Sequence, residues 1–574
     1  MTTKIKSYIM LLGLAAVMCA CNKFLDAMPD SRIEVDTPEE IRALLNSAYP
    51  DISIVRMTEL ASDNADDLNG EDNGHYDRFS EQCFRWQEVT EQDNENPTMA
   101  WQSYYSAIAA ANHALAAMDR MGGATTDELK ALKGEALLCR AYSHFMLVNL
   151  FALNYSQAHS SSDLGVPYTT TPETTLDPKY TRATVAENYV SIEKDLLEGL
   201  SLMSDAIYSV PSYHFNAKAA YTFASRFYLF YQKFDKVIQY SSLALGDNPA
   251  SLMRNYDVMK DMPTDDMQPR SAQYTSSSEQ ANLLLIPVYS TEPMYYSGNP
   301  MGSRFNNNSY IAQAEQFFLT PWAPNNSSAM QSQELFKIYW FYSAVYNKCM
   351  FPKQPYYFEE VNSNTHTGFY RTLSVAFKIE EALLNRAEAY AVTNQFDKSL
   401  SDINVWTNNF IADSVKYNTY QYDENWNYIY ANIEVPKKLT LESIRNWAQT
   451  YDYYKPEAPL PRKHLHPEWI TLTEGSDQEN LIQTILLIRR LEFLHEGMRW
   501  FDIKRYGIDL YRRLIIASLN VLEISDFMQY RDPRQAIQLP FEVRAAGLTP
   551  NPRPQNTNND SYEIWSPVTN VFEF

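Results

Sequence analysis

Residues 225–244 (SRFYLFYQKFDKVIQYSSLA) and 387–406 (AEAYAVTNQFDKSLSDINVW), which start 162 positions apart, follow one pattern. Each segment has a small residue, a tyrosine three positions later, and the letters FDK after a short turn. The matching residues are Ser225 and Ala387, Tyr228 and Tyr390, Phe234 and Phe396, Val237 and Ser399, and Ala244 and Trp406. Such spacing is typical of tetratricopeptide-like repeats, in which a small residue lets two helices approach and an aromatic residue fills the turn. The pattern predicts a mainly α fold built on a helical repeat scaffold.

Further amphipathic segments extend this scaffold along the chain. We expect repeat helices at about 97–152, 183–246 and 375–410, and a C-terminal helix at about 479–507. Between them lie long irregular stretches rich in Pro, Asn, Ser, Thr and Tyr, at roughly 155–182, 247–280, 289–330 and 411–475. Loops of this length in a compact domain usually carry function, so we expect these excursions to form a ligand-binding face.

The first 20 residues have the features of an export signal. Lys4 and Lys6 precede an apolar run at 9–17, and small Ala20 stands before Cys21, as a lipoprotein signal peptidase requires. The apolar core is about 12 residues long, whereas a transmembrane helix needs roughly 20. We therefore expect residues 1–20 to be a lipoprotein signal peptide and Cys21 to carry the lipid, with an uncleaved signal anchor as the alternative.

Charge and composition narrow the class of protein. The formal net charge is −22, and the acidic residues are spread along the chain rather than gathered in a tail. Nucleic-acid binding draws on clustered Lys and Arg, so this balance argues against a nucleic-acid partner and against adsorption on anionic lipid. Residues 21–574 contain no Gly/Ser linker, which favours a single domain.

The most specific stretch lies near the C-terminus, at residues 489–507 (RRLEFLHEGMRWFDIKRYG). Glu492 and Glu496 share one helix face, and Gly497 is suited to a helix C-cap. One interpretation of this segment, in which Arg and Glu alternate beside Trp and Phe, is a general acid/base cluster. Paired charges that hold a helix junction explain the same pattern at less chemical cost, and we favour that interpretation.

This C-terminal stretch resembles the signature of the SusD-like (RagB/SusD) nutrient-uptake lipoproteins. Other phrases resemble the family in the same order: Cys21 to Asp26 (CNKFLD) with Pro29; Trp101, Tyr104, Ile108, Ala111 and Asn112; Gly134 to Ala136 with Arg140, Ala141 and Phe145; and Arg531 to Arg534 (RDPR) with Leu539 and Pro540. Each phrase is weak alone, but their order and spacing cover nearly the whole chain.

The resemblance implies a lipid-anchored protein on the outer-membrane surface of a Gram-negative bacterium. It implies a lid for a SusC-like TonB-dependent transporter that captures oligosaccharide or, in some members, peptide. In family terms, the helical repeats pack toward the transporter and the irregular excursions build the ligand face.

Candidate ligand-binding residues follow from sugar chemistry, because a sugar ring has an apolar face for Trp or Tyr and a polar rim for Asp, Asn or Arg. One set lies in the loop at 61–96: Asp63, Asp66, Tyr76, Arg78 and Trp86. A second set follows in the excursion at 289–330: Tyr295, Tyr296, Arg304, Asn306 and Trp322. We hypothesise that the two loops converge into one site, with surface packing as the alternative for each side chain.

Other sites and reactions find little support in the sequence. The acidic stretch at 66–74 (DDLNGEDNG) suggests a structural calcium site but departs from the EF-hand pattern, so a solvated loop is favoured and we expect no cofactor or metal. HExxH, GxSxG, GxGxxG and P-loop motifs are missing from the chain. A surface glycoside hydrolase stays open, because it needs only two carboxylates. A purely structural surface protein is the third alternative to a binding protein without catalysis.

Overall fold

The computed structural model describes residues 35–553, apart from 70–75, 93–94, 176–177, 261, 264–265, 299–300, 324–332, 339, 425, 457 and 517–519. The predicted signal peptide and Cys21 lie outside the described residues. Within the part of the chain that is described, no helix combines the length and apolarity needed to cross a bilayer.

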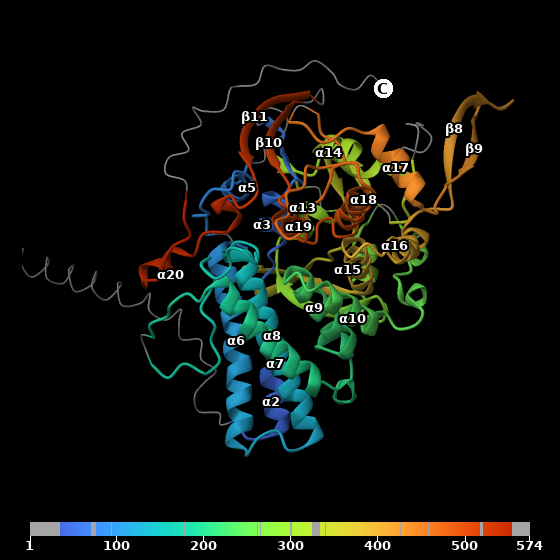
Figure 1. Ribbon diagram of the computed structural model, residues 1–574. Helices are drawn as coiled ribbons and strands as arrows, with labels where there is room; N and C mark the ends of the chain where they lie inside the picture. The colour runs from blue at the N-terminus through green and yellow to red at the C-terminus, as the bar shows by residue number, and fades with distance from the viewer. Residues whose placement is uncertain are drawn as a thin grey trace, which may run out of the picture.

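Paired helices form the scaffold of the molecule (Figure 1). The main ones are α6 (Pro97–Arg120), α7 (Asp127–Phe151), α8 (Val185–Leu202), α9 (Ala217–Phe230), α10 (Phe234–Leu245), α15 (Ile379–Val392), α16 (Phe396–Phe410), α18 (Asp477–Glu492) and α19 (Arg499–Tyr506). Helix α7 packs against both α6 and α8, α10 packs against both α9 and α15, and α15 also contacts α16 and α18. The predicted mainly α, tetratricopeptide-like fold is confirmed.

Capping residues determine where these helices begin. The side chains of Asn96, Thr126 and Asn216 each accept a hydrogen bond from a backbone N–H in the first turn of α6, α7 and α9. Thr184 and Glu187 form a reciprocal capping box at the start of α8. These contacts satisfy backbone donors that have no partner inside the helix.

The two matching sequence segments form the same helix–turn–helix. Gln232 and Asn394, 162 positions apart, both adopt left-handed backbone conformations, with φ of 61° and 59°. In each turn the residue after the left-handed one donates its N–H to the carbonyl of the motif tyrosine: Lys233 to Tyr228 at 3.0 Å, and Gln395 to Tyr390 at 2.8 Å. The shared letters therefore encode a shared turn geometry.

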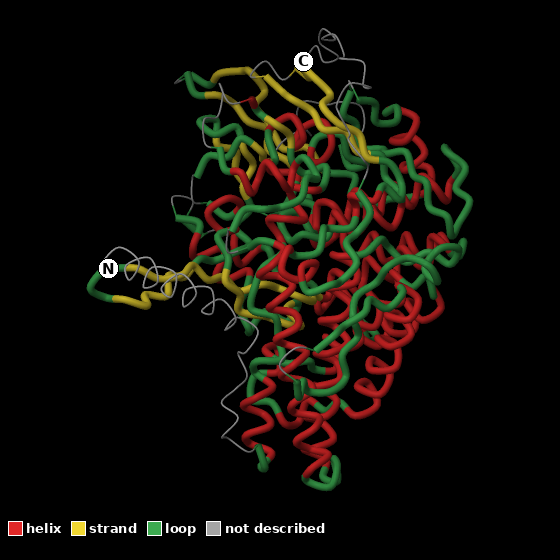
Figure 2. Tube along the Cα trace, turned by 90° about the vertical axis from the view of Figure 1, so that its left-hand side faces the viewer, coloured by secondary structure: helices red, strands yellow, loops and turns green. Residues whose placement is uncertain are grey.

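Within the described residues, four small sheets accompany the helices. A four-stranded sheet has the order β11 (Asn520–Met528), β10 (Leu510–Ile516), β1 (Asp66–Asp67), β3 (Phe305–Asn306), and a three-stranded sheet has the order β2 (Asn282–Tyr289), β7 (Thr367–Lys378), β6 (Tyr357–Asn362). Two hairpins complete the set: β4 (Phe341–Ser343) with β5 (Lys348–Met350), and β8 (Ser414–Tyr422) with β9 (Tyr428–Glu434). The β8–β9 hairpin extends from the body in Figure 1, and the β6–β7 hairpin does so in Figure 2.

Short helices occupy parts of three of the four stretches that we expected to be irregular: α11 (Asp257–Lys260), α12 (Gln268–Tyr274), α13 (Glu292–Tyr296), α14 (Ser309–Ile311) and α17 (Leu441–Thr450). Other short helices lie outside those stretches: α2 (Pro38–Leu45), α3 (Val55–Ala61), α5 (Arg78–Phe84) and α20 (Phe541–Ala545). A π-helical turn (Ala312–Phe317) and short 3-10 turns connect several of them. The excursions are therefore more ordered than their composition suggests.

The expectation of one C-terminal helix over 479–507 is wrong in one respect. Helix α18 ends at Glu492 and α19 begins at Arg499, and the connecting turn contains His495 (φ 62°) and Gly497 (φ 78°). A left-handed residue cannot continue a right-handed helix, so the chain reverses here. Gly497 lies in this turn rather than directly after the helix, and its N–H donates to the Glu59 carboxylate at 2.8 Å.

The charges of this segment hold the helix junction together, as the structural interpretation proposes. Arg489 binds Asp502 through two hydrogen bonds of 2.8 and 3.0 Å. Arg505 reaches Glu388 on α15 at 2.7 Å. All four side chains are buried, and a buried ion pair of this kind is strongly destabilised when one partner is removed.

We predict that Gly497→Ala destabilises the protein by roughly 2–4 kcal/mol. The left-handed backbone accounts for roughly 1–2 kcal/mol, and overpacking accounts for the rest. A Cβ atom at this position would lie 2.5 Å from the Thr58 hydroxyl oxygen. Thermal or denaturant unfolding followed by circular dichroism measures the change.

Gly475→Ala is the matched control, because Gly475 has the same φ of 78° and no atom within 4 Å of an added Cβ. It should cost only the backbone part, about 1–2 kcal/mol. Equal losses for the two variants would contradict the packing role assigned to Gly497.

Candidate functional site

Strand pairing brings the two predicted loops together. Strand β1 pairs antiparallel with β3, in the register Asp66 to Asn306 and Asp67 to Phe305, and β1 pairs in parallel with β10. The Leu68 N–H extends the ladder by donating to the Arg304 carbonyl at 2.9 Å. Parts of the two loops that are 237 residues apart are thus neighbours, although this adjacency alone does not make a ligand site.

A buried layer of charges supports these strands. Asp63 binds Arg499 through two hydrogen bonds of 2.8 Å, and Asp66 binds Arg513 at 2.8 and 3.0 Å. Burial alone would raise the pKa of the Asp63 carboxyl, but Arg490 and Arg499 outweigh it and hold that pKa well below its usual value. Burial raises the pKa of Asp66 above its usual value in spite of Arg513. Asp63 and Asp66 therefore form buried ion pairs inside the protein, and neither is exposed to a ligand at the surface.

Above these strands lies a small polar patch, here called the Tyr76 patch, which consists of the exposed Tyr76 and Arg78, the partly buried Glu81, Arg85 and Arg304, and the buried Asp67 that holds the two arginines. Arg304 binds the Asp67 carboxylate at 2.6 and 2.8 Å, and Arg85 binds it from the other side at 3.0 Å. The Tyr76 hydroxyl donates to Glu81 at 2.7 Å, and half of the Tyr76 residue surface (50%) is exposed. An exposed aromatic ring next to guanidinium and carboxylate groups matches the faces and hydroxyls of a sugar.

The two tryptophans predicted to stack on a ligand are buried in this structure. Trp86 is 6% exposed, its indole N–H donates to the Ala61 carbonyl at 2.9 Å, and the Arg512 guanidinium lies 3.9 Å from its ring centre. Trp322 is 0% exposed, and its ring centre lies 5.7 Å from that of Trp406. Large rings contribute most when they are fully packed, and neither indole presents a free face to solvent here.

Tyr295 and Tyr296 border a small internal cavity beside β3 rather than an open cleft. The Arg56 guanidinium lies 4.0 Å from the Tyr295 ring centre, and the buried Tyr296 ring stacks on His495 at 4.3 Å. The cavity that they border has a volume of about 10 Å³, which is enough for roughly one water molecule. Asn306, beside them, is also buried. As a ligand-binding set, the residues expected from the sequence stay a prediction.

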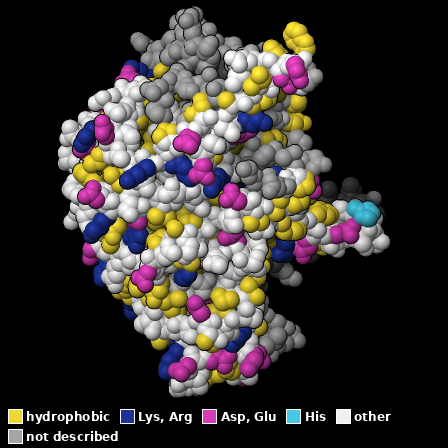
Figure 3. All heavy atoms as spheres, turned by 90° about the vertical axis from the view of Figure 1, so that its right-hand side faces the viewer, with side chains coloured by type: hydrophobic (Ala, Val, Ile, Leu, Met, Phe, Trp, Pro, Cys, Tyr) yellow, Lys and Arg dark blue, Asp and Glu magenta, His cyan; other side chains and the backbone are white. Residues whose placement is uncertain are grey.

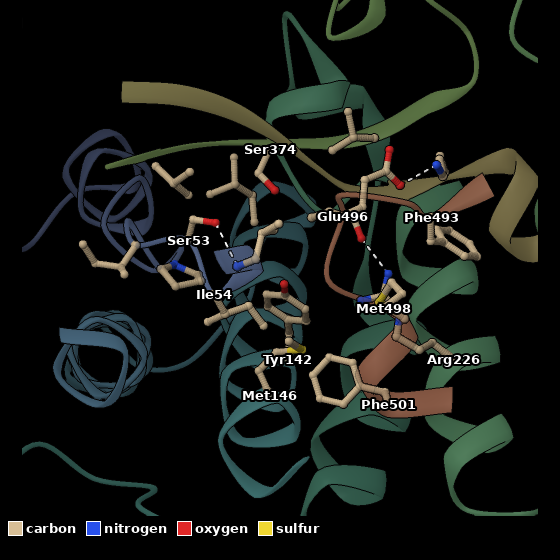
Figure 4. Close-up of a pocket in the computed structure, with 18 of the residues that line it drawn as sticks. Ser53, Ile54, Tyr142, Met146, Arg226, Ser374, Phe493, Glu496, Met498 and Phe501 are labelled. Atoms are coloured by element: carbon tan, nitrogen blue, oxygen red, sulfur yellow. Dashed lines mark hydrogen bonds and ion pairs between the residues drawn. The ribbon is translucent and has the colours of Figure 1, made fainter. Parts of the chain in front are cut away.

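Two larger cavities lie elsewhere in the described part of the chain. One of about 70 Å³ is enclosed between α7, α9 and the turn after α18, and Tyr142, Arg226 and Glu496 are among its lining residues (Figure 4). A second, of about 250 Å³, lies beside Glu468 and Trp469. Ligand pockets typically have volumes of about 300–1,000 Å³, so both are small for an oligosaccharide, which points to the open surface instead.

Sequence reasoning did not single out the exposed aromatic residues of the two projecting hairpins. They are Tyr357, Phe358 and Phe369 on β6–β7, and Tyr422, Trp426, Tyr428 and Tyr430 on or between β8 and β9. In Figure 3, hydrophobic side chains gather beside the hairpin that projects to the right. A signal was present for β8–β9, because tyrosines stand at every second position there, at 420 and 422 and at 428 and 430, which is the period of a strand.

Nothing in the described residues supports a calcium site at the acidic stretch 66–74. Asp66 and Asp67 face arginine side chains, and the rest of the acidic stretch, residues 70–74, lies outside the described residues. Among the residues that are described, no group of three or more His, Cys, Asp and Glu side chains is arranged to hold a metal ion.

A buried carboxyl group, that of Glu292, lies on α13, the short helix that also carries Tyr295 and Tyr296. Glu292 begins α13 and accepts a hydrogen bond from the Ser53 hydroxyl, and Glu95 lies nearby with Arg56 at 3.2 Å. Burial, reinforced by the charge of Glu95, raises the pKa of Glu292 to about 8. Glu292 is therefore protonated in the folded protein at neutral pH.

Comparison with known proteins relates this chain to the SusD-like proteins. A profile of SusD-like proteins, described as "Starch-binding associating with outer membrane", matches residues 23–229, and a profile of the SusD family matches residues 294–565. None of the curated protein sequences matches the chain significantly.

Several solved structures share the fold. A SusD superfamily protein from Bacteroides thetaiotaomicron is 17% identical, with 90% of this chain and 100% of that chain covered and a TM-score of 0.56. A putative sugar binding protein from Bacteroides vulgatus is 18% identical, with 91% and 99% covered and a TM-score of 0.55. A SusD-like carbohydrate binding protein from Bacteroides vulgatus is 14% identical, with 89% and 96% covered and a TM-score of 0.54.

We predict that Glu292→Gln changes how stability depends on pH. Between the unfolded pKa near 4.5 and the folded pKa of about 8, the folded state keeps a proton that the unfolded chain releases, so the free energy of unfolding falls as pH rises. Glutamine cannot ionise and does not carry this loss. The melting temperature of the variant minus that of the parent should therefore increase from pH 5 to pH 8 and then level off.

The exposed Glu442, in the first turn of α17, provides the matched control variant Glu442→Gln. A difference for Glu292→Gln that stays constant over this pH range would contradict a protonated Glu292 in the folded state.

Proposed function

This chain belongs to the SusD family, and we propose on that basis that it is a cell-surface lipoprotein that binds oligosaccharide and delivers it to a SusC-like TonB-dependent transporter without catalysis. The observation that carries the proposal is the family match at both ends of the chain, over residues 23–229 and 294–565. The helical scaffold and the solved relatives of the same fold support it.

The proposed location is the outer-membrane surface, with the protein held there by lipid on Cys21. The export signal and the position of Cys21 support this, as does the family description, which names association with the outer membrane. The acidic surface favours a covalent anchor, because anionic lipid repels a chain with a net charge of −22.

The proposed ligand is an oligosaccharide, and two solved proteins of the same fold are described as a carbohydrate binding protein and a putative sugar binding protein. The Tyr76 patch offers matching chemistry, because Tyr76 presents a ring and Arg304 and Arg85 present donors at its edge. Arg304 and Arg85 are both fixed by Asp67, so little side-chain entropy is lost when a sugar hydroxyl binds them.

Binding without catalysis is the simplest use of this chemistry. A glycoside hydrolase needs two free carboxyl groups on either side of the bond to be cleaved. On the Tyr76 patch, Asp67 is held by Arg85 and Arg304, and Glu81 is held by Arg85 and Tyr76. Capture by stacking and hydrogen bonding needs no proton transfer, and delivery then requires only that the docked protein open and close over its partner.

Calorimetric titration of the mature chain from Asn22 onward, against plant, host and microbial glycans and a peptide pool, tests the proposal. We expect saturable binding to at least one glycan and no release of reducing sugar. Arg304→Ala and Tyr76→Ala should each weaken that binding about tenfold, which corresponds to about 1.4 kcal/mol. Arg445→Ala removes an exposed arginine of α17 that is paired with Asp477, and this variant should not change the glycan affinity.

Other outcomes would replace the proposal. Binding of peptides with no glycan binding would assign the chain to the peptide-importing branch of the family. Hydrolysis that disappears when a single carboxylate is substituted would make the protein a surface glycosidase. No binding to either class would favour a structural role.

A further inference from the structure

The β8–β9 hairpin, residues 414–434, forms an arm that projects from the body of the molecule at the upper right of Figure 1. Its base is fixed: Val415 is buried, the Val435 N–H donates to the Asp413 carbonyl at 2.9 Å, and Lys437 binds Asp413 at 2.7 Å. Beyond the base the arm is a two-stranded ribbon, and most of its described side chains are exposed. Such a ribbon is marginally stable alone, so its exposed side chains call for a reason other than packing.

One face of the arm carries a strip of aromatic rings. Tyr422 and Tyr428 are directly paired across the strands, and their ring centres lie 4.7 Å apart. Trp426, in the turn at the tip, lies 6.0 Å from Tyr422, and Tyr430 continues the strip toward the base. The ammonium of Lys416 lies 4.5 Å from the Tyr430 ring centre. Four neighbouring rings are therefore presented to solvent along one edge of the protein.

The backbone at the tip is strained in a way that packing does not explain. Trp426 has a φ of 63°, a conformation that bulky residues rarely adopt and that costs about 1–2 kcal/mol. Asn427 and Trp426 donate backbone hydrogen bonds to Asp423, at 2.8 Å to its carboxylate and 3.1 Å to its carbonyl. Trp426 is nonetheless 82% exposed, so no core contact compensates for the strain. Strained positions of this kind are concentrated at functional sites.

We propose that this aromatic arm is a glycan-binding site, separate from the Tyr76 patch, that holds neutral polysaccharide by stacking sugar rings on Trp426, Tyr422 and Tyr428. The proposal rests on the proposed function and extends it from capture of oligosaccharides to contact with long polymers. Beside these rings the Asn427 side-chain amide donates to the Asp423 carboxylate at 3.2 Å, and such a polar pair suits the hydroxyl rim of a stacked sugar.

Charge selects the class of polysaccharide. Asp423 and Glu424 are both exposed at the tip, and the whole chain has a net charge of −22. Anionic polymers, such as those built from uronic acids, would be repelled there, whereas neutral polymers would not. A stable protein–protein interface buries about 800 Å² on each partner, whereas sugar stacking needs only the exposed faces of single rings, which favours a polymer ligand over a protein partner.

The position of the arm is consistent with this role. The described chain begins at the α2 end of the molecule, at the bottom of Figure 1, and the arm lies at the opposite end. The 14 positions from Cys21 to residue 35 can span up to about 50 Å, so a lipid on Cys21 would leave the body free to orient with the arm toward the medium. In that orientation the arm would meet arriving polymers.

Affinity electrophoresis of the mature chain tests the proposal, with galactomannan, xyloglucan or starch in the gel as neutral probes and polygalacturonate as the anionic probe. We expect at least one neutral probe, and not polygalacturonate, to retard the protein. Trp426→Ala and Tyr428→Ala should each raise the apparent dissociation constant about tenfold. Phe541→Ala, which removes another exposed ring (70% exposed) on α20, should leave it unchanged.

Trp426→Asn separates binding from folding. Asparagine tolerates the left-handed conformation, so this variant should keep or slightly raise the melting temperature while losing retardation. Trp426 is also the most exposed of the tryptophans that the structure describes, so a neutral probe should protect the parent protein, but not Trp426→Asn, from quenching by acrylamide.

The outcomes distinguish this proposal from the proposed function. If a neutral probe retards the parent and all arm variants equally, the arm proposal is wrong while glycan capture stands. If no glycan of any length binds the parent, both are wrong. If arm variants bind polysaccharide normally but lose a protein partner in co-purification, the arm is a protein contact and the glycan assignment is overturned.

Discussion

A buried network of ion pairs joins the two ends of this chain, and the candidate face depends on it. Asp63 and Asp66, early in the sequence, bind Arg499 and Arg513, more than 400 residues later. Glu315 lies between them and binds Arg490 at 2.8 Å. Burial of these charges is costly unless every partner is in place, so the network tolerates one arrangement of its strands. That arrangement seats β1 between β10 and β3 and so positions the Tyr76 patch.

The rest of the architecture consists of a helical scaffold and of long connections that fold on its surface. Helix pairs with locally determined caps and turns form the rigid scaffold, and the long connections fold into short helices and hairpins on its surface. Rigid elements position side chains more accurately than loops do. Among the described residues, the exposed aromatic rings concentrate on the two projecting hairpins rather than in an enclosed pocket. A surface that binds extended polymers needs such open, aromatic edges more than a deep cavity.

The fold was predictable because its signals are local. The spacing of small and aromatic residues encodes the α9–α10 and α15–α16 pairs, and Thr184 with Glu187 encodes the start of α8. The site was less predictable, because burial depends on distant partners. Trp322 is covered by Trp406, 84 positions away, and Trp86 by Arg512, and neither contact can be deduced from local composition. The β8–β9 arm was within reach of sequence reasoning, since tyrosines stand at every second position on both sides of the Asp423 turn, but we interpreted that stretch as irregular.

Capture at the surface and delivery to a transporter form the central claim, and one measurement tests it most directly. The full-length chain, including residues 1–20 and carrying an affinity tag, is purified in mild detergent from outer membranes of cells that use the glycan identified by titration. The account predicts that a TonB-dependent β-barrel protein co-purifies in equal amount, that the complex retains the glycan uncleaved, and that Cys21→Ala moves the protein out of the membrane fraction. A protein that is purified alone from those membranes, or that cleaves the glycan, would contradict the account.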